Sequence, residues 1–340
     1  MNDITNVSSG NQPIMQIKNL KTYFDAGKTK GEKKYVKAVD DVSLDINRGE
    51  VIGLVGESGS GKSTIAYTIM GMYKPTAGEI YFEGEKLSKS KNNRPMRLKR
   101  DIQIVFQDPA TSLNPYQNVR QILEMPLSVH HLYEGKTERE KRIKQLLDMV
   151  ELPYSYMYKT PSQMGGGERQ MISIARALAS EPRMIILDEP TSALDVSIQA
   201  KIINMLLALQ KEKNLTYLFI THDLSLMRNI STRVAILYLG RVAEFAPTEM
   251  FFKAPQHPYT KMLLSSIPVV SVEEEALKPE RVESVGEIPS PVDIPPGCSF
   301  HQRCYAAMEE CSVVDPITYH TDKEHYVRCH LCKKGMVEDN

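Results

Sequence analysis

The chain has 340 residues, 41% of them hydrophobic and 25% charged, which is typical of a globular protein with a sizeable core. Lysine plus arginine and aspartate plus glutamate both number 42, so the formal net charge is zero and no overall field attracts nucleic acid or acidic lipid. No apolar run approaches the roughly 18 residues that cross a bilayer, and the polar N-terminus lacks a signal-peptide core. We therefore expect a cytosolic chain without nucleic-acid ligands, held at a membrane only by a partner.

The first residues with regular structure are expected after a flexible tail at 1–14. Short β-like runs then read MQIKNL, YVKAVDDVSLDI and EVIGLV, and a polar, Gly- and Lys-rich hairpin connection is expected at 26–34. Residues 56–64, GESGSGKST, fit the phosphate-binding pattern G-x-x-x-x-G-K-[ST] between a predicted strand and a predicted helix. The expected phosphate ligands are Gly56, Glu57, Ser58, Gly59, Ser60, Gly61, Lys62, Ser63 and Thr64.

Each part of this loop has a physical role in binding a nucleotide. The glycines let backbone N–H groups curl around a phosphate, and the following helix directs its positive end at the same anion. Lys62 is expected to reach the β- and γ-phosphates, and the Ser63 hydroxyl to ligate Mg²⁺. The alternative is a glycine-rich turn that binds nothing.

Further along the chain, GEIYFEG and RDIQIVFQD have strand character, whereas residues 110–182 carry helical periodicity and no convincing strand. Strand patterns return at MIILDE, TYLFITHD and RVAILYLGR, with a predicted helix between the first two. This alternation predicts a mainly parallel core sheet with a helical insertion. From Val269 the composition changes, which predicts a linker at 269–296 and a small Cys-bearing region at 297–340.

Polar side chains follow three of these strands. The strand 184–187 ends in Asp188 and Glu189, which fit the roles of a Mg²⁺ ligand and of the group that orients or deprotonates the attacking water. His222 and Gln107 also follow apolar strands, where His222 could sense the γ-phosphate and Gln107 could contact Mg²⁺ or the water. A solvated acidic turn and a structural histidine are the alternatives.

In order, these motifs resemble the ATPase subunit of ABC transporters: GESGSGKST, FQDP at 106–109, MGGGERQ at 164–170, IILDEP at 185–190, SALD at 192–195 and THD at 221–223. The resemblance covers residues 15–268. It implies an α/β fold, in which a RecA-like phosphate-loop ATPase core carries an antiparallel β subdomain and a helical subdomain. It also implies that two such domains pair head to tail around two ATP molecules.

The resemblance assigns roles to single residues. Lys62 and Glu189 would be catalytic, Gln107 the Q-loop residue, Asp195 the D-loop aspartate and His222 the switch histidine. Ser63, Gln107 and Asp188 would hold Mg²⁺. Phe24 matches the aromatic position that stacks on adenine, with Tyr35 as the alternative.

The signature segment departs from the family's usual Leu-Ser-Gly-Gly-Gln. It reads Met164 followed by Gly165, Gly166, Gly167 and Glu168, so the serine hydroxyl that meets the partner's γ-phosphate is missing and Glu168 brings no obvious gain. We expect the partner's ATP site to be weakened while the site on this chain's own loop stays competent. The alternative is that the backbone N–H groups suffice.

The C-terminal segments HPYTKMLLSSIP, PPGCSFHQRCYAAMEEC and VRCHL resemble those of oligopeptide/dipeptide importer ATPases. In that subfamily four cysteines, here Cys298, Cys304, Cys311 and Cys329, can hold an iron–sulfur cluster. Four thiolates suit a [4Fe-4S] cluster or zinc equally by count. Cys332 makes a C-x2-C pair with Cys329, which slightly favours zinc, with His301 and His330 nearby. Free buried thiols are the third possibility.

The predicted function is that of an ATP-hydrolysing subunit of a peptide importer at the cytoplasmic face of the membrane. Its expected cofactors are ATP and Mg²⁺, with a [4Fe-4S] cluster or zinc on the cysteines. Its expected partners are a second ATPase subunit, two permease subunits and, indirectly, an extracytoplasmic solute-binding protein. Alternatives are an importer of oligosaccharide or nickel, a mainly regulatory ATP-binding subunit, and a soluble ABC-type ATPase without a transport role.

Overall fold

The computed structural model describes residues 13–29, 31–267, 286–322 and 324–335. The predicted tail at 1–14 lies outside these ranges except for its last two residues, as do residues 269–285 of the predicted linker. Ile14, the last residue of that tail, is buried and its carbonyl accepts a hydrogen bond from the N–H of Glu83 (2.8 Å). No helix in the described ranges is long and apolar enough to cross a bilayer.

The core is an eight-stranded sheet in the order β11-β12-β10-β9-β3-β8-β7-β6. Strands β9, β3, β8, β7 and β6 pair in parallel, and β3, β7 and β8 are buried along their whole length, which explains their continuous apolar sequences. The predicted parallel core is confirmed. The parallel strands are β3 (Val51–Val55), β6 (Ile102–Val105), β7 (Met184–Asp188), β8 (Thr216–Thr221) and β9 (Arg233–Tyr238).

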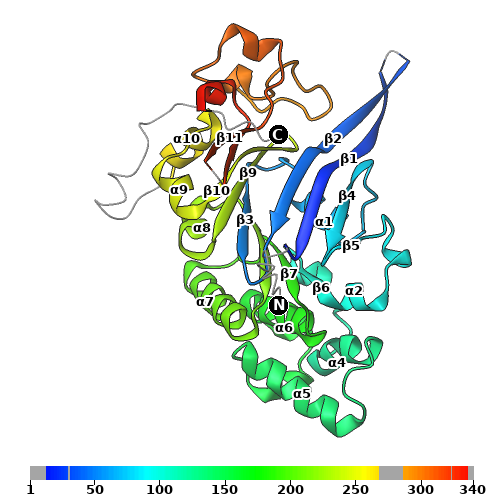
Figure 1. Ribbon diagram of the computed structural model, residues 1–340. Coiled ribbons are helices and arrows are strands. Elements are labelled where there is room, and N and C mark those ends of the chain that lie inside the picture. The colour runs from blue at the N-terminus through cyan, green and yellow to red at the C-terminus, as the bar shows by residue number, and fades with distance from the viewer. Residues whose placement is uncertain (1–12, 30, 268–285, 323, 336–340) are drawn as a thin grey trace, which may run out of the picture.

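A second, antiparallel sheet in the order β2-β1-β4-β5 lies beside the core in Figure 1. Its strands are β1 (Met15–Thr29), β2 (Glu32–Ile46), β4 (Ala77–Phe82) and β5 (Glu85–Lys86). The sequence predicted a hairpin connection over 26–34. The connection is shorter than that, because β1 and β2 stay paired as far as Thr29 and Glu32. Strand pairing uses the backbone, so polar side chains exposed on both faces do not end it.

Helices cover the core sheet and build the region between β6 and β7, in which the described residues 106–183 contain no strand. Helices α4 and α5 lie farthest from the C-terminal region in Figure 1. Two apolar clusters of buried side chains fill the interior, and the larger one joins this helical region to the core sheet. The helices are α1 (Lys62–Ile69), α2 (Met96–Asp101), α3 (Pro109–Ser112), α4 (Val119–Val129), α5 (Lys136–Met149), α6 (Gly166–Ala179), α7 (Val196–Lys213), α8 (Leu224–Ile230), α9 (Thr248–Lys253) and α10 (Pro258–Ser265).

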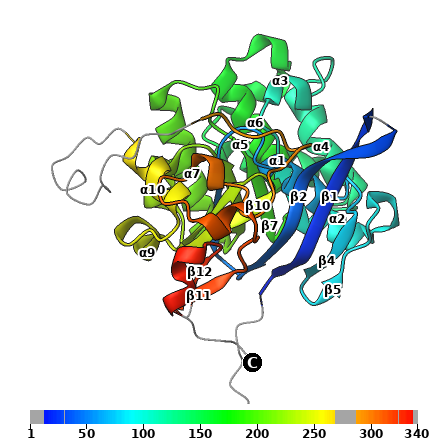
Figure 2. The same cartoon turned by 90° about the horizontal axis from the view of Figure 1, so that it is seen from above.

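The C-terminal region is attached to the core by strand pairing. Strand β10 (Arg241–Pro247) pairs antiparallel with β9 on one side and with β12 (His325–Val327) on the other, and β11 (Tyr319–Asp322) completes the edge. Figure 2 shows this red segment against β10. The region expected as a separate appendix after a linker therefore continues the central sheet, and its short strands are stabilised by the β10 edge that they cover.

A buried carboxylate lies under this junction. Glu244 on β10 has no exposed surface, and it accepts hydrogen bonds from the N–H groups of Gln256 and His257, both at 2.8 Å. Nε2 of His325, from β12, lies 2.7 Å from the same carboxylate. Nδ1 of His257 accepts a hydrogen bond from the N–H of Tyr259 (3.0 Å) and so caps α10. Burial lowers the pKa of His257 to about 4.

This lowered pKa predicts a loss of stability in mild acid. The unfolded chain binds a proton at His257 below about pH 6.5, whereas the folded chain does not until about pH 4, so stability is lost as the pH falls through this window. Between pH 8 and pH 5 the histidine should lower the free energy of unfolding by about 2 kcal/mol. His257→Asn keeps a side-chain acceptor for the helix cap but cannot titrate. Urea unfolding at both pH values should show the smaller pH effect in the variant, and equal effects would contradict the assignment.

Candidate active site

The phosphate loop runs from the end of β3 to the start of α1 and depends on two glycines. Gly61, the N-cap of α1, has φ of 104°, and a Cβ atom there would lie 2.1 Å from the carbonyl oxygen of Ala38. A Cβ at Gly56 would lie 2.3 Å from the carbonyl oxygen of Leu237. Both contacts are with backbone, which cannot swing aside, so the loop can pack against its neighbouring strands only with glycine at these positions.

Lys62 bends back over the loop. Its Nζ donates hydrogen bonds to the carbonyl oxygens of Gly56 (2.7 Å) and Glu57 (3.0 Å). Burial lowers the pKa of Lys62, while the nearby carboxylates of Glu189, Asp188 and Glu57 oppose that shift. The ammonium is thus held among oxygen atoms inside the loop, where a phosphate oxygen could replace a carbonyl as its partner.

Asp188, the last residue of β7, is completely buried beside this loop. Its Oδ1 accepts a hydrogen bond from the Ser63 hydroxyl (2.9 Å). Its Oδ2 is buried and has no donor with ordinary hydrogen-bond geometry among the described residues. Burial raises the pKa of Asp188 more than hydrogen bonds from Ser63 and Tyr67 and the charge of Lys62 lower it, so the charged form is only partly compensated. A hard cation would meet this need, and Ser63 with Asp188 offers the oxygen ligands that Mg²⁺ prefers.

Glu189, the next residue, is contacted by side chains from two other strand ends. Nε2 of Gln107, two residues after β6, donates to Oε2 of Glu189 (2.9 Å). Nδ1 of His222, directly after β8, lies 3.5 Å from Oε1. The structure thus brings together three of the predicted site residues. Glu189 also has a φ of 45°, an uncommon left-handed conformation for a side chain of its size and one that costs on the order of 1–3 kcal/mol.

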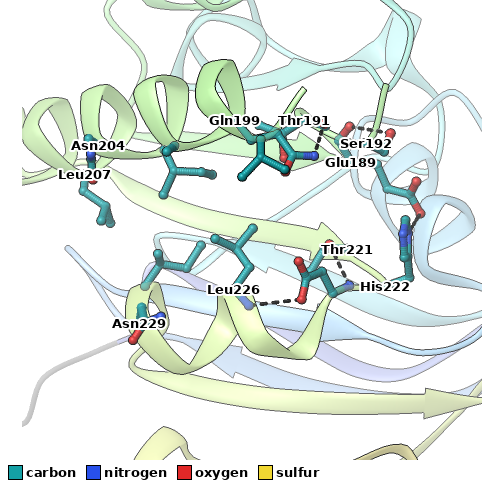
Figure 3. A pocket seen from close by; sticks show the side chains of 15 residues that line it. Glu189, Thr191, Ser192, Gln199, Asn204, Leu207, Thr221, His222, Leu226 and Asn229 are labelled. Carbon is teal, nitrogen blue, oxygen red and sulfur yellow. Dashed lines mark hydrogen bonds and ion pairs between the residues drawn. The ribbon is translucent and has the colours of Figure 1, made fainter. Parts of the chain in front are cut away.

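A pocket of about 440 Å³ opens from Glu189 and His222 and extends between α7 and α8 (Figure 3). Two hydrogen bonds link residues at its polar end, where the Ser192 hydroxyl donates to the carbonyl of Glu189 (3.2 Å) and the Gln199 amide donates to the carbonyl of Thr191 (2.8 Å). Glu189 and His222 therefore lie at a boundary between the phosphate loop and an open space that water can enter.

The signature segment forms the start of α6. Gly165 is the N-cap with extended backbone, and its N–H donates to the Glu168 carboxylate (2.8 Å). Glu168 also accepts a hydrogen bond from the Tyr156 hydroxyl. The carboxylate that had no evident use in the sequence is thus half of a capping box. A Cβ at Gly167 would lie 2.6 Å from Cγ2 of Ile198, so this glycine allows α6 and α7 to approach closely.

Three further predicted residues have structural surroundings but no demonstrated ligand role. Asp195 caps α7 by accepting a hydrogen bond from the N–H of Ile198 (3.0 Å). The Phe24 ring packs edge-on against Tyr73, with ring centroids 5.0 Å apart, while Tyr35 is 42% exposed. Stacking of adenine on Phe24 or Tyr35 stays a prediction.

The predicted metal ligands of the C-terminal region do not form a metal site as they stand. In the described ranges, which include all five cysteines, no group of three or more His, Cys, Asp or Glu side chains is arranged to hold a metal ion. Burial, with a smaller contribution from neighbouring cysteines, raises the pKa of Cys304 to about 11 and that of Cys329 to about 12. The thiols of Cys304 and Cys329 are therefore neutral at pH 7 and not preformed as thiolate ligands.

Sequence reasoning missed two residues that contact the phosphate loop. The Tyr259 hydroxyl, on α10, accepts a hydrogen bond from the N–H of Glu57 (3.2 Å), and Arg303, in the C-terminal region, pairs with the Glu57 carboxylate (2.8 and 3.1 Å). They lie 202 and 246 residues from Glu57 in the chain. No local pattern marks them, since only the folded sheet brings these segments together.

Comparison with known proteins places this geometry in a family. Residues 39–192 match the family described as ABC transporter, and residues 243–311 match the oligopeptide/dipeptide transporter C-terminal region. The chain is 44% identical over 327 residues to the putative oligopeptide transport ATP-binding protein YkfD of Bacillus subtilis, covering 96% of this chain and 98% of that protein. It is 40% identical over 330 residues to the dipeptide transport ATP-binding protein DppF of Haemophilus influenzae, covering 96% and 100%.

Solved structures agree with this assignment. A dimeric post-hydrolysis state of the ATP-binding cassette MJ0796, bound to ADP and phosphate, is 33% identical with a TM-score of 0.60, covering 69% of this chain and 98% of that one. Another dimeric structure of MJ0796, described as a bacterial ABC transporter cassette, is 34% identical with a TM-score of 0.59 and covers 69% and 98%. This chain belongs to the ABC transporter ATP-binding proteins, in the branch that carries the oligopeptide/dipeptide transporter C-terminal region.

Proposed function

We propose that this chain binds and hydrolyses MgATP to power a membrane permease that imports peptides. The observation that carries the proposal is the convergence of Gln107 and His222 on Glu189, one residue after the buried Asp188 that holds Ser63. Phosphoryl transfer needs positioning and charge neutralisation more than covalent chemistry, and this arrangement supplies both.

Each side chain has a distinct task in the proposed reaction. Lys62 and the loop N–H groups bind the phosphates. Ser63, Gln107 and Asp188 would hold Mg²⁺, and bound Mg²⁺ would neutralise the charge that develops on the transferred phosphoryl group. Glu189 orients or deprotonates the attacking water, and its hydrogen bond from Gln107 and contact with His222 hold its carboxylate in place. His222 senses the γ-phosphate, which is consistent with its 63% exposed side chain.

Substitution of Glu189 tests this assignment. Glu189→Gln keeps the shape and the acceptor oxygen but removes the base, so ATP hydrolysis by the assembled transporter should fall on the order of a hundredfold or more. Binding of ATP should change little. Phosphate release and equilibrium nucleotide binding measure the two effects, with Lys62→Ala as the comparison that should lose binding. Hydrolysis at the unchanged rate in Glu189→Gln would overturn the role of Glu189.

The active unit is proposed to be a head-to-tail pair of ATPase domains. In this pair, Gly165–Glu168 and Asp195 of one domain would face the ATP that is bound on the other domain. The dimeric ATP-binding cassettes among the related structures support this arrangement. Because Gly165 lacks a hydroxyl, the partner's site would receive only backbone N–H groups and the positive end of α6. The pair would then have unequal sites, and a second, different ATPase subunit would be its natural partner. A mainly regulatory role of this chain is the competing proposal.

Gly165→Ser separates these possibilities. The position has extended backbone, and an added Cβ would meet only Oε2 of Glu168, at 3.8 Å, so serine fits without strain. Since Gly and Ser differ by only a few tenths of a kcal/mol as N-caps, stability should not change. If the missing hydroxyl weakens the partner's site, turnover or ATP cooperativity of the complete transporter should rise severalfold. An unchanged ATP dependence would contradict unequal sites.

The proposed permease contact lies on the helical region between β6 and β7. Tyr116, Met125, Val129 and Tyr158 are large apolar side chains that are at least half exposed there, which suits a protein interface. Two permease subunits would hold the chain at the cytoplasmic face of the membrane, and a solute-binding protein would act through them. Peptide cargo is supported by the names of the relatives; oligosaccharide or nickel import and a soluble role are the alternatives.

We also propose that Cys298, Cys304, Cys311 and Cys329 bind a [4Fe-4S] cluster or zinc, although their described arrangement is not that of a metal site. Support comes from the backbone hydrogen bond that the N–H of Cys298 donates to the carbonyl of Cys311 (2.8 Å), which places two of the four cysteines side by side. Protein purified without air should contain about four irons and absorb near 400 nm if a cluster is present, or one zinc without that absorbance. If the protein contains neither iron nor zinc in stoichiometric amount, the cysteines are free structural thiols and the proposed metal site is wrong.

A further inference from the structure

Glu57 puts a carboxylate into a loop that must bind phosphates. Its carbonyl accepts one of the Lys62 hydrogen bonds (3.0 Å), and its N–H donates to the Tyr259 hydroxyl (3.2 Å). A negative charge at this point repels phosphate and attracts the Lys62 ammonium. The loop therefore works best if another group neutralises Glu57 and holds its side chain away from the phosphates.

Arg303 supplies the neutralising charge, and it shares the holding of the carboxylate with the Tyr259 hydroxyl, which donates to Oε2 of Glu57 (3.2 Å). The two terminal nitrogens of Arg303 contact the two carboxylate oxygens of Glu57 at 2.8 and 3.1 Å, the two-pronged geometry that guanidinium and carboxylate favour. The Arg303 side chain is only 5% exposed, against 28% for Glu57, so solvent screens this pair less than it screens a surface ion pair.

Aromatic rings fix the position of the guanidinium. Its central carbon lies 5.8 Å from the ring centroid of Tyr238 and 6.0 Å from that of Phe300. Tyr259 packs against both of these rings, with centroids 4.8 and 5.2 Å away. Two rings, from β9 and the C-terminal region, thus lie against the arginine, and the Tyr259 ring from α10 packs behind them and attaches them to the core.

The turn that carries Arg303 is itself part of the cysteine-bearing segment. The 3₁₀ turn η4 (His301–Arg303) begins where the carbonyl of Cys298 accepts a hydrogen bond from the N–H of His301 (3.0 Å). The N–H of Cys298 in turn donates to the carbonyl of Cys311 (2.8 Å). The folding of this segment therefore decides where Arg303 lies.

We propose that Arg303 is a positioning residue of the ATP site, through which the C-terminal region neutralises and holds Glu57 so that Lys62 stays available to phosphate. The inference rests on the proposed binding of ATP at the 56–64 loop. It gives the C-terminal region a task in nucleotide binding in addition to its strand contacts with β10. Without Arg303, the Glu57 carboxylate can turn toward Lys62 and compete with ATP.

The first test measures ATP binding and hydrolysis by the full-length chain in its transporter. Arg303→Gln should raise the dissociation constant for ATP and the KM by about tenfold, while kcat at saturating ATP stays within about twofold. The loss should shrink as salt rises. Arg328→Gln is the matched control, because Arg328 pairs with Asp315 (2.8 Å) in the same region but does not touch the loop. A similar loss in both variants would overturn the proposal.

The second test asks whether the lost affinity comes from the charge of Glu57. Glu57→Gln combined with Arg303→Gln removes both charges, so ATP binding should return to within about threefold of the unchanged chain. A merely structural role of Arg303 predicts no such rescue, and its absence would overturn the inference. Arg303→Lys keeps the charge but loses the two-pronged pairing, so its loss of ATP affinity should be smaller than that of Arg303→Gln, about threefold. It takes the place of Arg303→Gln if that variant does not fold, and an ATP affinity equal to that of the unchanged chain would then overturn the proposal.

Lys62→Ala separates failure of this inference from failure of the proposed function. If Lys62→Ala still binds ATP as the unchanged chain does, ATP does not lie on this loop and the proposed site is wrong. If Lys62→Ala loses binding while Arg303→Gln behaves as the unchanged chain, only the role of Arg303 is wrong.

Discussion

The site depends on the parallel alignment of β3, β8 and β7. Val55 pairs with Thr221, and Asp188 pairs with Ile220, so the carboxyl ends of the three strands lie at one edge of the sheet. Parallel strands buried on both faces cannot slip without moving apolar side chains into the wrong environment. The register of the core therefore fixes where the phosphate loop, the two carboxylates and His222 meet.

That edge gathers charges that the core cannot neutralise by itself. Asp188 is fully buried, Glu189 takes a strained backbone conformation, and Lys62 is buried among carbonyl oxygens. Each of these features costs stability in the chain alone, and a cation or a phosphate would compensate the buried charges of Asp188 and Lys62. Ligand binding and the stability of this edge are therefore coupled, because the ligand supplies the charges that complete the arrangement.

The C-terminal region is connected both to the core sheet and to the phosphate loop. Its strand β12 covers β10 and contacts the buried Glu244 through His325, and its arginine reaches Glu57 in the phosphate loop. The region was expected to be a separate appendix, since its composition differs from that of the core. Composition indicates how much apolar surface a segment can bury, but it does not indicate which strand of the core sheet the segment will pair with.

The sequence by itself determined the order of strands and helices, the phosphate loop and the identity of the acidic, amide and imidazole groups at the strand ends. These are local patterns, in which a few neighbouring residues specify a turn, a strand or a helix start. Only the tertiary structure decided that β1 and β2 stay paired through 26–29 and 32–34, that Glu168 caps α6, that the C-terminal strands join the core sheet and that Arg303 neutralises Glu57. These features arise from contacts between segments up to 246 residues apart, and such contacts leave no periodic trace in the chain because their geometry exists only after the core has folded.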